Sequence, residues 1–203
     1  MTAPSAGRIV LATHNPHKVE EFQAIVAEAR PDLEVVAYDG PEPVEDGVTF
    51  AENALIKARA ASIHTGLPAL ADDSGICVDV LGGSPGVFSA YWAGHAKDAG
   101  ANLALLLDQL SDVADPHRAA QFVSTIALVI PSGSEQTVAG VWPGRLATEA
   151  AGVGGFGYDP VFIPDGQDRS AERTVAEWSA AEKNAVSHRA RAFAALLPLL
   201  VAV

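Results

Sequence analysis

Cysteine is nearly absent from this sequence of 203 residues, and long apolar runs are missing. The single cysteine, Cys77, excludes an intramolecular disulfide framework and a zinc site built on several thiolates. No apolar run approaches the roughly 18 residues of a membrane-spanning helix, and residues 1–7 lack the charged and apolar regions of a signal peptide. We therefore expect a cytoplasmic protein with no membrane partner. Cys77 lies in an apolar stretch, and we expect a buried, inert thiol.

Positive charge is also scarce, with 13 Lys and Arg against 25 Asp and Glu and a formal net charge of −12. Affinity for nucleic acid depends largely on basic side chains that neutralise phosphates, so we expect no nucleic-acid partner. The lysines are only Lys18, Lys57, Lys97 and Lys183. Because Arg is the usual cation of this chain, the lysines that fall inside motifs are candidates for contacts with phosphate oxygens.

Internal repeats, low-complexity tracts and flexible linkers are absent, so nothing marks a domain boundary. The hydrophobic fraction of 49% is typical of a globular protein, and the length fits one large domain or two small lobes. A Gly-Lys-Ser/Thr sequence is missing as well, which excludes a Walker phosphate-binding loop. We expect residues 1–203 to form a single domain.

Two adjacent carboxylates, Asp72 and Asp73, stand between apolar runs at residues 67–71 and 76–80. We expect two strands here with a turn at residues 72–75, and turn chemistry alone explains the sequence Asp-Ser-Gly. Two acids are more than a turn needs, because an unpaired buried charge is costly. The functional alternative is that the carboxylates hold Mg²⁺ or that one of them activates a water, since Mg²⁺ bound with substrate phosphates uses one or two protein carboxylates.

The N-terminal region predicts a strand at residues 8–12, a turn, and a helix from Val19 to about Arg30. Such a turn presents backbone N–H groups and the positive end of the helix dipole. Thr13, Asn15 and Lys18 add a hydroxyl, an amide and a cation, which favours a phosphate-binding turn. Ordinary helix capping explains Thr13 and Asn15 equally well.

An acid-rich loop, residues 39–47, follows a predicted strand at residues 33–37 and precedes a well-marked helix. Thr49 and Glu52 form a capping-box pattern at the start of that helix, which we expect to end near His64. The capping role makes Glu52 a poor candidate ligand. Glu45 in the acid-rich loop has no such structural explanation, and it is therefore the better candidate.

The middle of the chain predicts mostly ordinary structure. Residues 82–86 are rich in glycine and must bend sharply. A short helix is expected at residues 101–110, followed by two antiparallel strands at residues 119–130 and 135–141 that are joined by a hairpin.

Residues 152–157 match the dinucleotide-binding pattern G-x-G-x-x-G, but the extended, proline-containing segment after them cannot be a helix. Because that fingerprint requires a strand before it and a helix after it, we reject a Rossmann site. What remains is a flexible loop that presents Phe156 and Asp159. An exposed aromatic side chain of this kind can stack on a nucleobase.

The C-terminal region predicts a helix that is capped by Ser187 and packs apolar residues against the core as far as Leu200. His188 and Arg189 then lie in its first turn, where cations oppose the helix dipole. A ligand anion or the polar edge of a base explains these two residues better than a chance surface position does.

Taken together, these segments resemble the inosine triphosphate pyrophosphatase family, whose members hydrolyse ITP, dITP and XTP. Six motifs occur in order: Thr13-x-Asn15-x-x-Lys18, Thr49-Phe50-x-Glu52-Asn53-Ala54-x-x-Lys57-Ala58, Asp72-Asp73-Ser74-Gly75, Leu81-x-Gly83-x-Pro85-Gly86, Gly155-Phe156-Gly157-Tyr158-Asp159-Pro160 and Glu182-Lys183-Asn184-x-x-Ser187-His188-Arg189. The resemblance implies an α/β fold, with a long central mixed β-sheet flanked by helices and two lobes with a nucleotide cleft between them. It also implies a homodimer.

The resemblance further implies residue roles. Glu45 and Asp73 are the Mg²⁺-site acids, Asp73 also orients or deprotonates the attacking water, and Asp72 supports the site. The implied substrate-binding residues are Thr13, Asn15, Lys18, Lys57, Ser74, Phe156, Gly157, Tyr158, Asp159, Lys183, His188 and Arg189. The chain departs from the family pattern at His14, where Gly is usual, and at Tyr91-Trp92, where Arg-Tyr is common.

The function that these observations predict is Mg²⁺-dependent hydrolysis of deaminated purine nucleoside triphosphates to the monophosphate and pyrophosphate. One alternative is a nucleotide-sensing module that binds without turnover, which needs the cations but not the acids. A serine hydrolase built on Ser74 and His188 lacks the G-x-S-x-G motif and is rejected.

Overall fold

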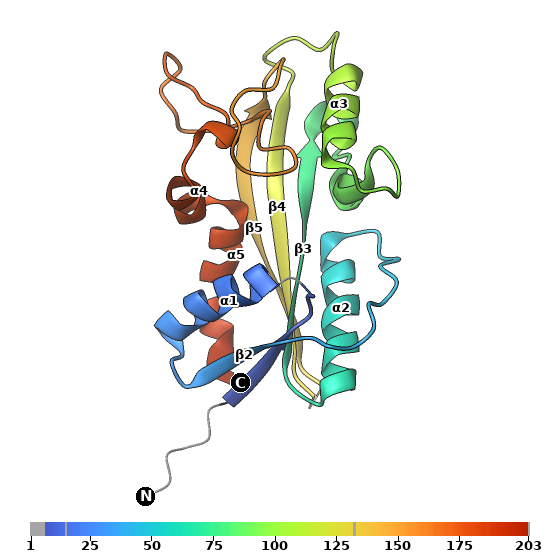
Figure 1. Ribbon diagram of the computed structural model, residues 1–203, viewed down its shortest axis with the longest axis vertical. Helices are drawn as coiled ribbons and strands as arrows, with labels where there is room; N and C mark the ends of the chain where they lie inside the picture. Colours follow the sequence, from blue (N-terminus) through green and yellow to red (C-terminus); the bar gives the residue numbers. More distant parts are fainter. Residues whose placement is uncertain (1–6, 15, 132, 203) are drawn as a thin grey trace, which may run out of the picture. The chain divides into compact units, whose positions relative to one another are not determined.

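The computed structural model describes residues 7–14, 16–131 and 133–202, and these form an α/β structure with a six-stranded sheet (Figure 1). The strand order is β2-β1-β3-β4-β5-β6. β1 pairs in parallel with β2 and β3, whereas β5 and β6 are antiparallel, so the prediction of a mixed sheet is confirmed. The strands are β1 (Gly7–Leu11), β2 (Leu33–Ala37), β3 (Ala69–Val78), β4 (Ala119–Val129), β5 (Glu135–Leu146) and β6 (Phe162–Pro164).

The helices at residues 16–29, 50–65, 99–109 and 188–196 fall close to the positions that the sequence predicts, whereas the helix at residues 180–186 was not predicted. They are α1 (Pro16–Ala29), α2 (Phe50–Thr65), α3 (Ala99–Gln109), α4 (Ala180–Val186) and α5 (His188–Leu196). Within the described residues, no helix has both the length and the apolar character needed to cross a membrane.

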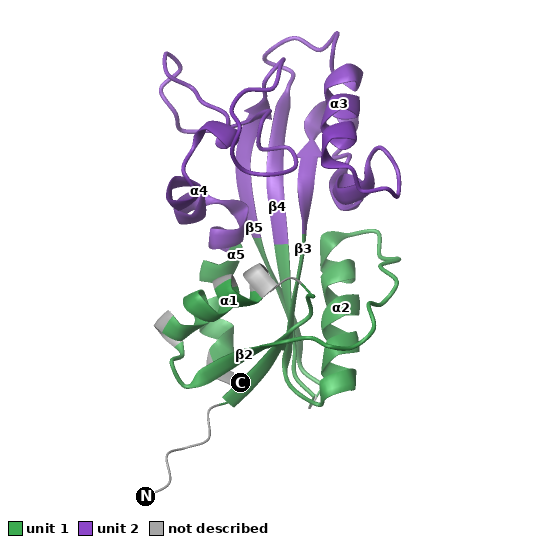
Figure 2. Cartoon of the chain, in the orientation of Figure 1, with its two compact units in different colours: residues 1–73, 125–139, 192–203 green, residues 74–124, 140–191 purple. Residues whose placement is uncertain are grey.

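The chain divides into two compact units (Figure 2). Unit 1 comprises residues 1–73, 125–139 and 192–203, and unit 2 comprises residues 74–124 and 140–191. Neither unit is continuous in sequence, which explains why composition showed no linker. The single domain over residues 1–203 and the nucleotide cleft between two lobes stay predictions.

The core of unit 1 lies on both faces of β1. Ile9 and Leu11 pack with Phe22 of α1 and Phe193 of α5, whose rings meet edge to face with centroids 4.1 Å apart. Val10 points to the opposite face, because side chains alternate along a strand, and packs with α2. The residues that α2 contributes are Ala54, Ala58 and Ala61. Small side chains on this helix bring its backbone close to the sheet.

Helix α2 begins where the sequence predicts. The side chain of Thr49 accepts from the Glu52 backbone, and the Glu52 carboxylate accepts from the Thr49 backbone N–H at 2.9 Å. Gly66 ends the helix with a positive φ of 69°. The interpretation of Glu52 as a cap is therefore confirmed.

The turn predicted at residues 72–75 is wrong, because β3 runs through this segment without interruption. The tertiary structure gives other reasons for Asp73 and Gly75. Asp73 is paired with a lysine, and a Cβ on Gly75 would lie 2.3 Å from Ser89 Oγ and 2.5 Å from Gly86 O. Gly75 therefore allows a close approach of chains and does not close a turn.

The core of unit 2 is aromatic. Trp142 of β5 and Phe162 of β6 are buried and meet edge to face at 5.5 Å, and Leu106 of α3 packs in the same cluster. β4 and β5 are neighbours joined by a short loop, so they are antiparallel as predicted. β5 extends past the predicted end at Val141, because its last residues pair with β6.

Cys77 is half-buried in β3, a lesser burial than we expected. Burial, with a smaller effect of Asp79, raises the pKa of its thiol, which keeps the thiol protonated at neutral pH. The expectation of an inert thiol agrees with this environment.

Candidate active site

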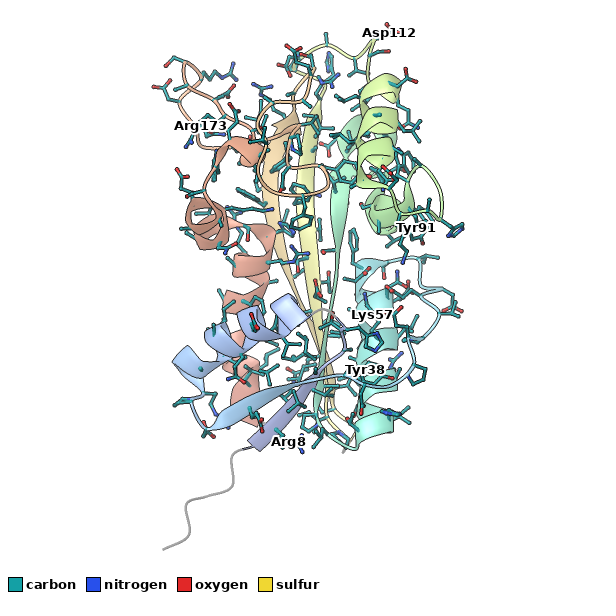
Figure 3. The ribbon with its side chains drawn as sticks, viewed as in Figure 1. Arg8, Tyr38, Lys57, Tyr91, Asp112 and Arg173 are labelled. Atoms are coloured by element: carbon teal, nitrogen blue, oxygen red, sulfur yellow. The ribbon has the colours of Figure 1, made fainter. Side chains whose placement is uncertain are left out.

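Three predicted site residues form a cluster in unit 1, in which one lysine contacts two carboxylates. The Lys57 ammonium on α2 lies 2.9 Å from Glu45 Oε2 in the acid-rich loop and 2.9 Å from Asp73 Oδ1 on β3. The side chains of Lys57 and Asp73 are 16% and 15% exposed, whereas Glu45 is 42% exposed. Figure 3 shows Lys57 projecting from α2. The lysine thus joins the two acids to which the family resemblance assigns a metal site.

The electrostatics of this cluster suit proton transfer near neutral pH. Burial raises the pKa of Asp73 to about 6, although Lys57 opposes the increase, and the charges of Glu45 and Asp72 add to it. For Lys57, burial acts to lower the pKa, but Asp73 and Glu45 together outweigh it and raise the pKa, so the lysine stays charged. A carboxylate with a pKa slightly below the working pH is deprotonated, yet it is basic enough to accept a proton from water.

A hollow of about 50 Å³ lies beside this cluster in unit 1. Its lining includes Thr13 from the turn after β1, as well as Glu45 and Lys57. Three of the predicted phosphate or metal residues are therefore brought together. Asn15 lies outside the described residues, and Lys18 lies in the first turn of α1 with a side chain that the structure does not describe.

The donor set at Lys57 fits a metal that is completed by a substrate. Among the described residues, no three or more His, Cys, Asp or Glu side chains gather into a group that could hold a metal. Mg²⁺ bound with phosphates needs only one or two protein carboxylates, and Glu45 and Asp73 both direct an oxygen to one cationic position. These two residues could therefore hold the ion, and the buried Asp72 is next to Asp73 in the chain.

A second cluster lies in unit 2 around the exposed ring of Phe156. Lys183 Nζ lies 4.4 Å from the ring centroid, and the Arg189 guanidinium carbon lies 5.4 Å from it. Lys183 also contacts Asp159 Oδ2 at 2.5 Å, and the same oxygen accepts from the Phe156 backbone N–H at 2.9 Å. Arg189 donates to Ser74 Oγ at 3.3 Å. The structure thus unites five of the predicted substrate-binding residues.

Glycine shapes the loop that carries Phe156. Gly155 has a φ of 70°, and a Cβ there would lie 2.2 Å from Asp159 Oδ2. Any other residue would therefore displace the carboxylate that orients Lys183. Gly157 also has a positive φ, of 61°. Two of the glycines that resembled a dinucleotide fingerprint thus serve this turn, and the other two, Gly152 and Gly154, lie against the backbone of Ala176.

Tyr158 and His188 have buried side chains, unlike Phe156 and Arg189. The Tyr158 hydroxyl donates to Ser89 O at 2.8 Å, and burial raises its pKa to about 12. The His188 ring is 4% exposed and stacks on Phe122 with centroids 4.9 Å apart. Both residues support the unit 2 core, and their contacts with substrate stay predictions.

The cap of α4 positions Lys183. The Glu182 carboxylate accepts from the Ser179 backbone N–H at 2.7 Å and also pairs with Arg173. The bond from the Ser179 backbone, followed by those from the Ser179 side chain and Arg173, lowers the pKa of Glu182 to about 2. In this sequence motif, Glu182 therefore caps the helix, and the next residue, Lys183, is the candidate substrate-binding residue.

Sequence reasoning did not select Tyr38 and Glu42, which line the hollow in unit 1. Glu42 belongs to the acid-rich loop, but nothing in its local sequence distinguishes it from the other acids there. The departure at Trp92 has a structural role, because its indole N–H donates to Gln109 on α3 at 2.8 Å.

Together with the fold, the two clusters define an α/β protein with a lysine shared by two carboxylates in unit 1 and an exposed aromatic ring flanked by two cations in unit 2. The model of the Ham1 family matches residues 9–199, and the chain belongs to this family. It is 62% identical over 196 residues to a dITP/XTP pyrophosphatase of Leifsonia xyli subsp. xyli, covering 97% of this chain and 96% of the relative. It is 52% identical over 197 residues to a dITP/XTP pyrophosphatase of Streptomyces coelicolor, covering 95% and 96%.

Solved structures agree with this family. A HAM1 protein from Coxiella burnetii superposes with a TM-score of 0.87 at 39% identity, covering 97% of this chain and 100% of the other. A nucleoside-triphosphatase named dITP/XTP pyrophosphatase from Mycobacterium abscessus gives a TM-score of 0.79 at 49% identity, covering 94% and 99%. The resemblance and the fold class that the sequence predicts are confirmed.

Proposed function

We propose that this protein is a nucleoside triphosphate pyrophosphatase that removes deaminated purine nucleotides, ITP, dITP and XTP, from the nucleotide pool. It hydrolyses them to the nucleoside monophosphate and pyrophosphate. The observation that carries the proposal is the Glu45–Lys57–Asp73 cluster in unit 1. Relatives of nearly the same length are named dITP/XTP pyrophosphatase, which supports this substrate class.

In the proposed reaction, Asp73 orients a water molecule and accepts its proton. The water oxygen attacks the α-phosphorus, the bond from that phosphorus to the bridging oxygen breaks, and pyrophosphate leaves with the bonding electrons. The pKa of about 6 at Asp73 suits the base role at pH 7. Lys57 lies beside Asp73 and stabilises negative charge that develops on the phosphate oxygens.

The proposal includes Mg²⁺ as cofactor, held by Glu45 and Asp73 and supported by Asp72. When bound, the ion supplies positive charge that neutralises the triphosphate and polarises its phosphorus–oxygen bonds. Such an ion is needed because bare carboxylates in an acidic protein repel a polyanion. Thr13, Asn15 and Lys18 are assigned to the phosphates, along with Lys57.

We assign base recognition to the cluster in unit 2. Phe156 stacks on the purine, and Lys183 and Arg189 are donors for its 6-oxo group. Asp159 fixes the position of Lys183, and Ser74 contacts Arg189. Gly157 permits the turn, and Tyr158 and His188 hold the surrounding core. The structure pairs Ser74 with an arginine, which cannot remove its proton, so a serine nucleophile has no support.

A homodimer and a cytoplasmic location complete the proposal. The family resemblance supports the dimer, and the proposed substrates belong to the cellular nucleotide pool. Light scattering after size-exclusion chromatography measures the oligomeric state, and a mass near 21.0 kDa would contradict the dimer.

The decisive test is a pyrophosphate-release assay with ITP and Mg²⁺. The parent should release pyrophosphate, not orthophosphate, and Asp73→Asn should lose most of the activity. Asp46→Asn is the matched control, because Asp46 is an exposed acid in the loop that carries Glu45. No release by the parent, together with tight ITP binding, would instead support a nucleotide-sensing module.

A further inference from the structure

The acid-rich loop that carries Glu45 is attached at both ends. At its start, the Tyr38 hydroxyl donates to Pro41 O at 2.9 Å. At its end, the Gly47 backbone N–H donates to Oδ1 of the buried Asn53 at 2.9 Å. Glu45 lies between these anchors and is bound to Lys57. The position of its carboxylate therefore depends on how firmly the intervening backbone is held.

His14 adds an attachment from the turn after β1. Its Nε2 lies 3.0 Å from Gly40 O, and its Nδ1 lies 3.1 Å from Glu42 Oε1. Its ring also stacks on Tyr38, with centroids 5.7 Å apart and planes 11° apart. Both ring nitrogens thus face oxygen acceptors of the acid-rich loop. One side chain thus links the predicted phosphate-binding turn to the acid-rich loop.

The contacts of His14 differ in strength. Glu42 is 78% exposed, so its contact with His14 is weakened by competing water. Gly40 and Tyr38 are buried, so the bond to the Gly40 carbonyl and the stack on the Tyr38 ring contribute more. A Cβ on Gly40 would lie 2.4 Å from the Tyr38 hydroxyl oxygen, which shows how closely the loop backbone approaches this ring. Figure 3 labels Tyr38 and Lys57 beside α2.

We propose that His14 is a positioning residue that holds the acid-rich loop on Tyr38 and thereby keeps Glu45 beside Lys57 and Asp73. The inference rests on the proposed function, because it concerns the position of Glu45 as a proposed metal ligand. The proposal depends on the side chain of His14, because the Gly that is usual at this position in the family motif has no side chain to make these contacts.

The test compares His14→Gly, which loses every contact, with His14→Phe, which keeps only the stack on Tyr38. The control is His64→Ala. His64 meets Tyr38 edge to face at 5.5 Å, and its ion pair joins Asp39, which is 88% exposed. Two readouts are measured: NMR order parameters of the Val44, Glu45 and Asp46 amides in metal-free protein, and the Mg²⁺ concentration for half-maximal pyrophosphate release.

In His14→Gly the order parameters should fall below about 0.6, the range of flexible backbone. Half-saturation by Mg²⁺ should rise about fivefold, the effect of losing one net hydrogen bond, while kcat at saturating Mg²⁺ changes by less than about twofold. His14→Phe should lie between His14→Gly and the parent, and His64→Ala should match the parent.

Unchanged order parameters in both His14 variants would overturn the proposal. If Glu42→Gln reproduced the full effect of His14→Gly, that would also overturn the proposal, because the exposed contact with Glu42 would then be the anchor. The NMR measurement needs no turnover. If the parent releases no pyrophosphate, the proposed function fails, while the order parameters still decide whether His14 holds the loop.

Discussion

Replacing Lys57 with Met removes the cation that two carboxylates share and keeps most of the side-chain volume. Breaking a buried ion pair often costs about 3–5 kcal/mol, because a charge is left without a partner. We expect a smaller loss here. Glu45 is 42% exposed and can be hydrated, and Asp73 can lose its unpaired charge by taking up a proton. With a pKa of about 6, protonating Asp73 at pH 7 costs only about 1.4 kcal/mol.

The loss should therefore depend on pH. The folded-state pKa of Asp73 is raised, so its contribution to stability is present below the ordinary carboxyl pKa and declines as the pH rises towards about 6. In Lys57→Met the cation that opposes this increase is gone, so the decline continues above pH 6. The difference in unfolding free energy between parent and variant should be small at pH 5 and should grow above pH 6 by up to about 1.4 kcal/mol per pH unit.

Urea unfolding of metal-free protein, followed by tryptophan fluorescence at pH 5, 6, 7 and 8, measures this difference. Arg59→Met is the matched control. Arg59 lies on the same helix and forms a two-point ion pair with Glu135, but its side chain is 48% exposed. The control should show a small loss without pH dependence between pH 5 and 8. A Lys57→Met loss that is equally large at pH 5 and pH 8 would refute the reasoning about Asp73.

Three further outcomes are expected. Pyrophosphate release should stop in excess chelator and return with Mg²⁺, and turnover that persists in chelator would contradict the metal assignment. Phe156→Ala should raise KM for ITP about tenfold through lost base stacking, whereas Val153→Ala in the same exposed loop should leave KM unchanged. An equal rise in KM in both variants would mean that the substitutions disturb the loop and not base stacking. The kcat/KM for ITP and XTP should exceed that for ATP by up to about 10⁴-fold. Arg189→Ala should reduce this difference in kcat/KM. Similar kcat/KM values for ATP and ITP in the parent would rule out recognition of the 6-oxo group.

The sequence alone determined the features that depend on neighbouring residues. The capping box of Thr49 and Glu52 set the start of α2, and the proline-containing segment after Gly157 excluded a dinucleotide fold, because both signals lie within a few residues of chain. Lys57 and Asp73 lie in motifs that resemble the family, and Glu45 stood out as a loop acid without a capping role. Their metal and phosphate roles came from the resemblance to the family.

Only the tertiary structure decided how those candidates meet. Residues 72–75 have the local chemistry of a turn, yet they lie in β3, where Lys57 compensates Asp73 and where Gly75 makes room for Ser89. Nothing near His14 in the sequence indicates its contacts with Gly40 and Glu42, because the partners are 26 and 28 residues away. Local propensity is set by adjacent residues, whereas the energy of a buried charge or a close backbone contact depends on which distant residues the fold brings to it.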